Sequence, residues 1–301
     1  MMPDDKLSNV EDPIGAHRGR LMGLAYRMLG SMTDAEDVLQ DAYLRYASAD
    51  ISTIRSKEAF LVTIVTRLCL DRLKSAKTKR EVYIGPWLPE PTPDADALSP
   101  QTALELADDL SFALLLTLER LSGQERAAFL LHDVFDRPYS EIATALGKSE
   151  AGCRQLASRA RKAVHEDREP RASSPDQHQL LLQRFMEAAA SGDAGRLQAL
   201  LTDDAIAYSD GGGVRIAALN PVIGADKVAR FFVGLMKKGI RENSIIRPVI
   251  RDVNGAPGLL VYVDEELDNV LSLELKQGKI STIFVVRNPE KLHGLAGGVL
   301  N

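Results

Sequence analysis

The first part of the chain carries apolar positions at helical spacing. They recur every three or four residues from Leu21 to Leu29, which predicts an amphipathic helix ending at Gly30. Thr33 is expected to be the N-cap of a second helix, because the acidic residues after it suit a positive first turn. A third helix is expected over about 57–75. The pattern predicts an all-helical domain.

A second helical block begins after residue 103. Leucines recur at helical spacing from Leu106 to Leu121, and Ser122 is expected to cap a further helix that runs through Val134. This block is also predicted to be all-α.

The end of this block predicts a helix-turn-helix over 140–164, with Gly147 where the first helix must turn. The outward face of its second helix carries side chains that can read base edges or contact phosphates. These are Ala151, Arg154, Gln155, Ser158, Arg159, Arg161 and Lys162. The alternative is an ordinary amphipathic helix pair with a solvated basic face.

The last block changes character, because two helices precede a series of strand-like runs. The runs are expected at 205–209, 244–252, 259–264, 270–275 and 280–287, with a helix at about 225–238 after the first of them. Asn254-Gly255 and Gln277-Gly278 are turn dipeptides at hairpin positions. We predict an α+β domain built on a curved antiparallel sheet.

Two linkers separate these blocks, so the fold class is multidomain. Five prolines within 15 residues, together with Trp87, interrupt the chain between the helical blocks. The expected divisions are 1–80, a Pro-rich acidic linker at 81–103, 104–166, a short linker at 167–175, and 176–301.

Charge is distributed unevenly along the chain. The formal net charge of −5 argues against a wholly basic nucleic-acid binder, but 67–80 carries +5 and 148–162 carries +4. Residues 81–119 hold eight acids and no Lys or Arg. Local charge therefore permits nucleic-acid contact at two patches. The patch at 67–80, taken alone, is more typical of a solvated helix face.

Other chemistry is sparse. Two cysteines far apart suit a reducing compartment, and the sequence has neither a signal peptide nor an apolar run long enough for a membrane span. The five histidines lack metal-ligand spacing. We expect a cytoplasmic protein that is not an enzyme and has no membrane partner, metal or cofactor.

Two long motifs resemble one family in the family's own order. D-A-E-D-V-L-Q-D-A-Y-L-R (34–45) and the helix at 59–75 resemble region 2 of the extracytoplasmic-function (ECF) sigma factors, and 139–162 resembles region 4. W-L-P-E-P (87–91), D-G-G-G (210–213) and N-P-E-K-L (288–292) resemble the group with a fused SnoaL-like C-terminal domain. Val214 stands where members of this group often carry lysine after the glycines.

The resemblance implies a sigma factor that directs core RNA polymerase to promoters. Region 2, a bundle of three or four helices, would bind the β′ clamp and the −10 element. Region 4 would bind the β flap and place the helix-turn-helix on the −35 element. The acidic linker would thread toward the path of the RNA. The implied clamp-binding residues are Asp37, Gln40 and Asp41, and those of the −10 region are Arg67, Arg72, Lys74 and Lys77.

The C-terminal cone is expected to regulate the sigma regions through contacts with the linker, as an activator or as an inhibitor. The residues expected in these contacts are Trp87, Leu88, Pro89, Asp210, Gly211, Gly212, Gly213, Asn288, Pro289 and Leu292.

Two other function classes stay open. The chain would be a SnoaL-like enzyme tethered to DNA if acid–base groups converged in the cone, where Asp203, Tyr208, Asp210 and His178 are candidates by residue type alone. It would be a one-component sensor if the cone held a small ligand and the helix-turn-helix acted without polymerase.

Overall fold

The computed structural model describes residues 15–50, 52, 54–93, 96–98, 109–166, 174–241 and 244–296. The start of the expected leucine stripe at Leu106 and most of the linker at 167–175 lie outside the described residues. The chain divides into two compact units, and the second contains more than the C-terminal block. Besides the residues from 164 onward, it includes 77–93 and 109–117, whereas 15–76, 96–98 and 118–163 form the first unit.

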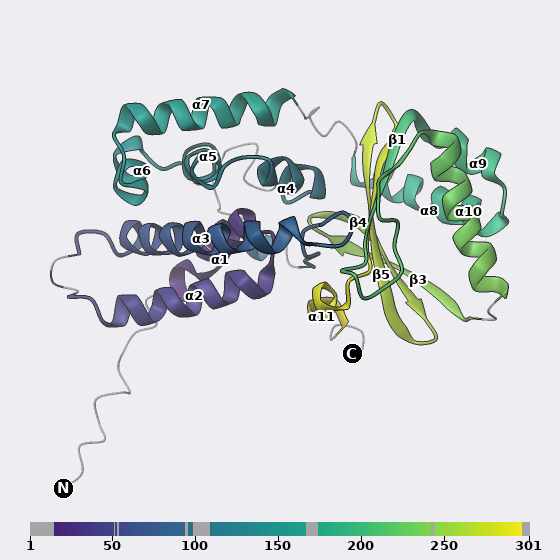
Figure 1. Cartoon of the computed structure of the whole chain (residues 1–301), viewed down its shortest axis with the longest axis horizontal. Coiled ribbons are helices and arrows are strands. Elements are labelled where there is room, and N and C mark those ends of the chain that lie inside the picture. The colour runs from purple at the N-terminus through teal and green to yellow at the C-terminus, as the bar shows by residue number, and fades with distance from the viewer. Residues whose placement is uncertain are drawn as a thin grey trace, which may run out of the picture. The chain divides into compact units, whose positions relative to one another are not determined.

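The first unit is built from helices (Figure 1). Two of them, α3 and α7, end in residues assigned to the second unit, and α4 begins in that unit and ends in the first. The elements are η1 (Gly15–His17), α1 (Arg18–Leu29), α2 (Met32–Ala47), α3 (Lys57–Glu81), η3 (Asp96–Leu98), α4 (Phe112–Glu119), α5 (Gly123–Phe129), η4 (Leu130–Val134), α6 (Tyr139–Leu146) and α7 (Glu150–Glu166).

Local signals set most of these helix ends. Gly30 closes α1 in the left-handed conformation (φ 68°), and Ser122 forms a capping box with Glu125 at the start of α5. The N-cap of α2 is Ser31, so the expectation of Thr33 was wrong. Ser31 has extended backbone and accepts a hydrogen bond from the Asp34 amide at 3.1 Å, because the chain turns directly after Gly30.

A buried arginine stabilises the packing of the first unit. Arg126 is 2% exposed and donates to the Met28 carbonyl at 2.5 Å and to Glu119 at 2.6 Å. Burial lowers the pKa of its guanidinium to about 10. The carbonyl at the end of α1 and a carboxylate from α4 thus supply the partners that a buried cation needs.

The segment η3 lies against α1 at two glycines. A Cβ atom on Gly19 would lie 2.4 Å from the Ala97 carbonyl oxygen, and one on Gly23 would lie 2.0 Å from that of Leu98. Arg27 donates to the same Leu98 oxygen at 3.0 Å. Glycine is therefore required here by close backbone approach.

The second unit contains a six-stranded sheet, and α8, α9 and α10 lie on one side of it (Figure 1). The strand order is β2-β1-β6-β5-β4-β3. Its elements are α8 (Pro175–Ser191), α9 (Ala194–Ala199), β1 (Leu201–Asp210), β2 (Val222–Ile223), α10 (Ala225–Arg241), β3 (Ile246–Val253), β4 (Ala256–Val263), β5 (Glu266–Lys276), β6 (Lys279–Val286), η5 (Pro289–Lys291) and α11 (His293–Ala296).

The predicted hairpin turns are present, but the sheet is mixed. Asn254-Gly255 and Gln277-Gly278 all have positive φ and join antiparallel strands. β1 and β6 instead run parallel, so the expectation of a purely antiparallel sheet was wrong at this pair. The two strands lie far apart in sequence, and local periodicity carries no information on their relative direction.

Each face of the sheet has its own core. Ala205, Ala207 and Leu273 pack with residues of α8 and α10 on one face. The other face carries Tyr262, Val270, Phe284 and Val286. Residues from outside the sheet that complete this second core are Leu88, Phe112, Leu292 and Leu295.

Candidate nucleic-acid interface and connector site

The helix-turn-helix has the expected geometry. Gly147 ends α6 in the left-handed conformation (φ 62°), and the Ser149 hydroxyl accepts a hydrogen bond from the Gly152 amide at 3.2 Å near the start of α7. Ile142 and Cys153 are buried between the helices' apolar faces. The turn therefore fixes α7 relative to α6.

The outer face of α7 presents nearly all the residues selected from the sequence. Those exposed are Ala151, Arg154, Gln155, Ser158, Arg159 and Lys162. Arg161 differs, because its Nε and Nη2 donate to the two carboxylate oxygens of Asp133 at 2.8 and 3.0 Å. These hydrogen bonds raise the pKa of Arg161. Arg161 connects α7 to η4 within the unit.

Arg154 is held by two neighbours. Its Nη2 donates to Glu150 at 2.8 Å, and its guanidinium carbon lies 4.9 Å from the centre of the Tyr139 ring. The Tyr139 ring also stacks on His132, with 4.3 Å between the centroids. More than half of the Arg154 side chain remains exposed.

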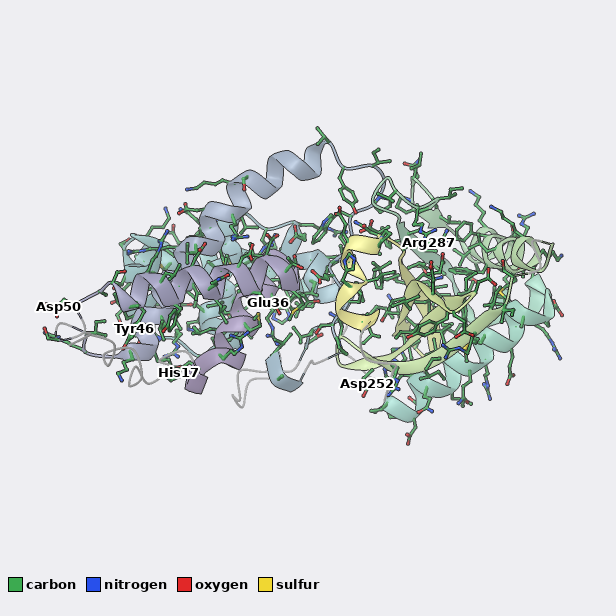
Figure 2. All side chains as sticks on the ribbon, turned by 90° about the horizontal axis from the view of Figure 1, so that it is seen from below. His17, Glu36, Tyr46, Asp50, Asp252 and Arg287 are labelled. Atoms are coloured by element: carbon green, nitrogen blue, oxygen red, sulfur yellow. The ribbon has the colours of Figure 1, made fainter. Side chains whose placement is uncertain are left out.

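The acidic face of α2 presents Asp37, Gln40 and Asp41 to solvent, beside Glu36 (Figure 2). Arg72 of α3 crosses this face. Its guanidinium lies 2.9 Å from Asp34, 3.2 Å from Asp37 and 3.8 Å from Asp41. Partial burial opposes the charge on Arg72, but the hydrogen bonds to Asp37 and Asp34 outweigh it and raise its pKa.

The other basic residues expected near the −10 element also have internal partners where their side chains are described. Arg67 donates to the carbonyls of Thr144 at 2.7 Å and Ala145 at 3.1 Å, at the end of α6. Lys74 pairs with Asp71 at 2.9 Å. The side chain of Lys77 lies outside the described part of the chain.

In the second unit, the buried Asp210 carboxylate binds the linker. Its Oδ1 accepts from the Tyr83 hydroxyl at 2.6 Å, and its Oδ2 accepts from the Leu88 amide at 2.9 Å. Lys291 Nζ lies 2.7 Å from Oδ2 and donates to the Leu88 carbonyl at 2.5 Å. Asp210 itself is fully buried, so each of these contacts is made away from water.

Aromatic rings surround this ion pair. Lys291 Nζ lies 4.3 Å from the centre of the Trp87 ring and 5.2 Å from that of Tyr83. Asn288 donates to the Tyr83 hydroxyl at 3.0 Å and caps η5, whose first residue is Pro289. Burial and the contact with Asp210 raise the pKa of Tyr83.

The triple glycine lies against the same group. The Gly212 amide donates to Asp210 at 3.0 Å, and a Cβ on this residue would lie 2.5 Å from the Asn288 side chain. Gly212 and Gly213 both have positive φ. A Cβ on Gly211 would lie 2.2 Å from the Arg215 carbonyl oxygen. The linker, the glycines and the C-terminal motif therefore meet at one buried carboxylate.

Arg287, labelled in Figure 2, supports this glycine-containing loop. It forms a two-point ion pair with Asp268 at 2.7 and 3.2 Å and donates to the Ile216 carbonyl at 2.5 Å. Burial would raise the pKa of Asp268, but these hydrogen bonds, with one from Asn269, lower it.

A second anchor holds the linker further along. The side-chain Oδ1 of Asn254 accepts a hydrogen bond from the Thr92 backbone amide at 3.0 Å, and the Asn254 backbone amide donates to the Thr92 carbonyl at 2.8 Å. The Asn254 side chain also donates to the Leu110 carbonyl at 2.9 Å. We define residues 83–93 as the docked connector.

Sequence reasoning missed three residues of this site, namely Tyr83, Asn254 and Lys291. Lys291 stands inside the C-terminal motif at 288–292. It is the one cation of that motif, which could have indicated an ion pair with Asp210. The Asn254-Gly255 dipeptide predicts only a turn, whereas the buried Asn254 side chain also binds the linker.

The four residues considered for catalysis are placed differently. Asp210 is occupied by the connector, and Tyr208 stacks on Phe284 with 5.7 Å between centroids. Asp203 is exposed on β1, and His178 is buried on α8. No group of three or more metal-binding side chains is found among the residues that the structure describes.

Comparison with known proteins covers both units. Family models for sigma-70 region 2 and sigma-70 region 4 match residues 14–79 and 111–164. The chain is 39% identical to the ECF RNA polymerase sigma factor SigJ of Mycobacterium tuberculosis, over 93% of this chain and 92% of that protein. The chain belongs to the ECF sigma factors of RNA polymerase. As a sigma factor it binds core RNA polymerase and promoter DNA.

Further matches show how far the relationship extends. The crystal structure of SigJ aligns with a TM-score of 0.72 at 35% identity, covering 93% of this sigma factor and 96% of SigJ. The Escherichia coli ferric citrate uptake sigma factor FecI matches at 34% identity over 50% of this chain and 85% of its own length. The SnoaL-like domain is therefore shared with SigJ, whereas FecI corresponds to about half of the chain.

Within the described residues, no helix is both long and apolar enough to cross a bilayer.

Proposed function

We propose that α7 of this ECF sigma factor reads the −35 element while region 2 binds the −10 element. The support is the exposed face of α7, where Arg154, Gln155 and Ser158 stand together above a buried apolar side. Arg161 is paired with Asp133 and belongs to the frame that orients α7. Arg159 Nε lies 2.9 Å from Glu125, but its side chain is 65% exposed, so the phosphate contacts are assigned to Arg159 and to the exposed Lys162. The protein acts in the cytoplasm, with region 4 docked on the β flap.

We assign polymerase binding to the exposed acidic face of α2. Asp37, Gln40 and Asp41 would contact the β′ clamp, with Arg72 setting the spacing of the carboxylates. Copurification with core polymerase tests this assignment. Asp37→Ala with Asp41→Ala is expected to abolish it, and Asp50→Ala on the exposed loop after α2 is the matched control. Unchanged copurification of the double variant would contradict the assignment.

We further propose that the SnoaL-like domain inhibits the sigma factor by holding the docked connector. The observation that carries this proposal is the Asp210 site, where the connector gives its backbone N–H and C=O groups to side chains of the second unit. A connector buried there cannot at the same time extend into a channel of the polymerase. Since Asp210 is occupied by the connector and the adjoining sheet face is filled by Leu88 and Phe112, we assign no catalytic role to Asp210 and no small ligand to this face of the sheet.

Promoter-directed transcription in vitro tests the regulatory proposal. Asp210→Asn removes the charge that pairs with Lys291 and is expected to raise transcript yield from a promoter selected by the holoenzyme. Asp203→Asn, an exposed carboxylate on the same strand, is the matched control. A yield equal to or below that of the unmodified chain, with the fold intact by circular dichroism, would contradict inhibition.

Truncation after Arg171 is a weaker test. It would remove the sheet that covers Leu88 and Phe112 and leave two large apolar side chains exposed. Point substitutions change the contact alone. Unchanged transcription after truncation would nevertheless exclude regulation by this domain.

A further inference from the structure

Arg154 is an exposed arginine on α7 whose guanidinium lies over an aromatic ring. The guanidinium carbon lies 4.9 Å from the centre of the Tyr139 ring, and Glu150 accepts a hydrogen bond from Nη2 at 2.8 Å. The Tyr139 ring is itself held by stacking on His132. The ring that supports Arg154 is thus fixed to the framework of the unit.

Stacking on a ring and binding a base use different parts of a guanidinium. The ring contacts the flat face, whereas the N–H donors point outward in the plane of the group. A guanine presents O6 and N7 to those in-plane donors in the major groove. The Tyr139 contact therefore restricts the side chain without consuming the donors needed for base recognition.

We propose that Tyr139 is a positioning residue that orders Arg154 for reading a base pair of the −35 element. This rests on the proposed role of α7. A long arginine side chain loses rotamer freedom when it is fixed in a complex, and the ring restricts that freedom before DNA arrives. Glu150 holds Nη2 in the free chain and yields this hydrogen bond when a base takes its place.

The size of the effect follows from the ordering cost of one side chain. Loss of the ring is expected to weaken binding about three- to tenfold at the base pair that Arg154 reads. It should leave the preference at other positions of the element unchanged. A residue with only a structural role would weaken binding to all sequences alike.

The experiment is a double-mutant cycle on the holoenzyme made from core polymerase and the full chain. A duplex pool with a randomised −35 element first defines the preferred sequence and the base pair whose preference Arg154→Ala removes. Binding of Tyr139→Leu, Arg154→Ala and the double variant is then measured on fragments that differ only at that base pair. Tyr139→Phe keeps the ring, loses only the hydroxyl and its hydrogen bond with Arg161, and is the matched control.

We expect Tyr139→Leu to lose discrimination at that base pair and to have no further effect once Arg154 is alanine. Tyr139→Phe should stay within about twofold of the unmodified chain, since the ring is retained. The positioning role is overturned if the effects of Tyr139→Leu and Arg154→Ala multiply in the double variant. It is also overturned if Tyr139→Phe loses as much discrimination as Tyr139→Leu.

The proposed role of α7 can fail separately. If Arg154→Ala leaves the preference unchanged at every position, Arg154 does not read a base and the inference falls with it. If Arg154→Ala matters but Tyr139→Leu leaves discrimination intact, only the positioning role is wrong.

Order in the free chain gives an independent readout. Nitrogen-15 relaxation of the Arg154 Nε–H group is expected to show a restricted side chain in the unmodified protein and a mobile one in Tyr139→Leu. An equally mobile group in both would overturn the inference, whatever the stability of the leucine variant.

Discussion

The two ends of the proline-rich linker are held by different sets of groups. In the first unit, residues 96–98 offer carbonyl oxygens, which lie against glycines of α1 and accept a hydrogen bond from Arg27. In the second unit, the docked connector offers N–H and O–H groups to Asp210 and Asn254. Backbone carbonyls are therefore bound at both ends, by Arg27 at one and by Lys291 and the Asn254 backbone amide at the other. The docked connector in addition donates hydrogen bonds to buried side-chain acceptors.

This difference shows why the local sequence of a linker says little about how tightly it is held. The prolines and the lack of helical periodicity predict an extended segment, and residues 84–93 form neither helix nor strand. The groups that fix it come from distant residues and are therefore invisible to local periodicity. Because different residues hold residues 96–98 and the docked connector, single substitutions can weaken each contact separately.

The largest effect is expected for Asp210→Asn. It leaves Lys291 without its anionic partner in a site where Asp210 has no solvent exposure, and breaking such a pair costs about 3–5 kcal/mol. Urea denaturation measures the loss, and exchange of the Leu88 amide should accelerate by about 100-fold or more. Asp203→Asn should change neither, and equal stability of the two variants would contradict the role of this carboxylate.

Asn254→Gly isolates the second anchor, because glycine keeps the positive φ of 55° at this turn. The Thr92 amide and the Leu110 carbonyl lose a buried partner, so we expect a loss of about 2–3 kcal/mol in urea denaturation. Gln277→Gly, at an exposed turn of the same kind with φ 52°, should be close to neutral. A similar loss in both variants would assign the effect to backbone entropy instead.

Gly23→Ala disrupts the contact between η3 and α1 in the first unit. A Cβ 2.0 Å from the Leu98 carbonyl oxygen forces η3 away from α1, at a cost of about 1–3 kcal/mol. Hydrogen exchange should accelerate in residues 96–98 and stay unchanged in the docked connector. Gly234→Ala, in a helix with open space around the new atom, should be neutral or stabilising. Faster exchange at both ends would show that the two anchors are coupled.

The smallest effect is expected for Tyr83→Phe, which removes one hydrogen bond to a charged group and costs about 1.5 kcal/mol near neutral pH. The folded state raises the Tyr83 pKa above its ordinary value of 10.0, so above that pH the unfolded chain loses a proton that the folded chain retains. The stability of the unmodified chain should therefore fall, and its advantage over Tyr83→Phe should shrink as pH rises past about 10. Tyr43→Phe, on the exposed side of α2, is the control, and a constant advantage across this range would contradict the assignment.

Helix periods, turn dipeptides and the order of the motifs were enough to predict the helix-turn-helix, the α+β domain and the sigma regions. Gly147 and the Asn254-Gly255 turn are local signals, and each lies where it was expected. The partners of charged side chains were not predictable in this way. Arg67, Arg72 and Arg161 were selected as DNA contacts by charge, yet each binds acceptors within its own unit. Charge gives the residue type of a binding surface, but the internal partners of each cation, such as Glu125 beside Arg159, depend on tertiary contacts.

The same limit applies to the sheet and to the connector site. Strand positions follow from composition and alternation, while the parallel pairing of β1 with β6 and the addition of residues 109–117 to the second unit depend on contacts between distant segments. Tyr83 and Lys291 are separated by more than 200 residues, so their proximity depends on the whole fold.

Leu88 and Phe112 cover the sheet face that carries Tyr262 and Phe284, so any molecule that binds this face must compete with them. Both side chains belong to the same polypeptide as the sheet, so they act as tethered competitors, with an effective concentration in the millimolar range for short connections. A diffusible compound must displace both side chains, so its apparent affinity is lower the more stable their contact with the sheet is. Variants that loosen the connector would therefore also sensitise the domain to apolar compounds that the unmodified protein ignores.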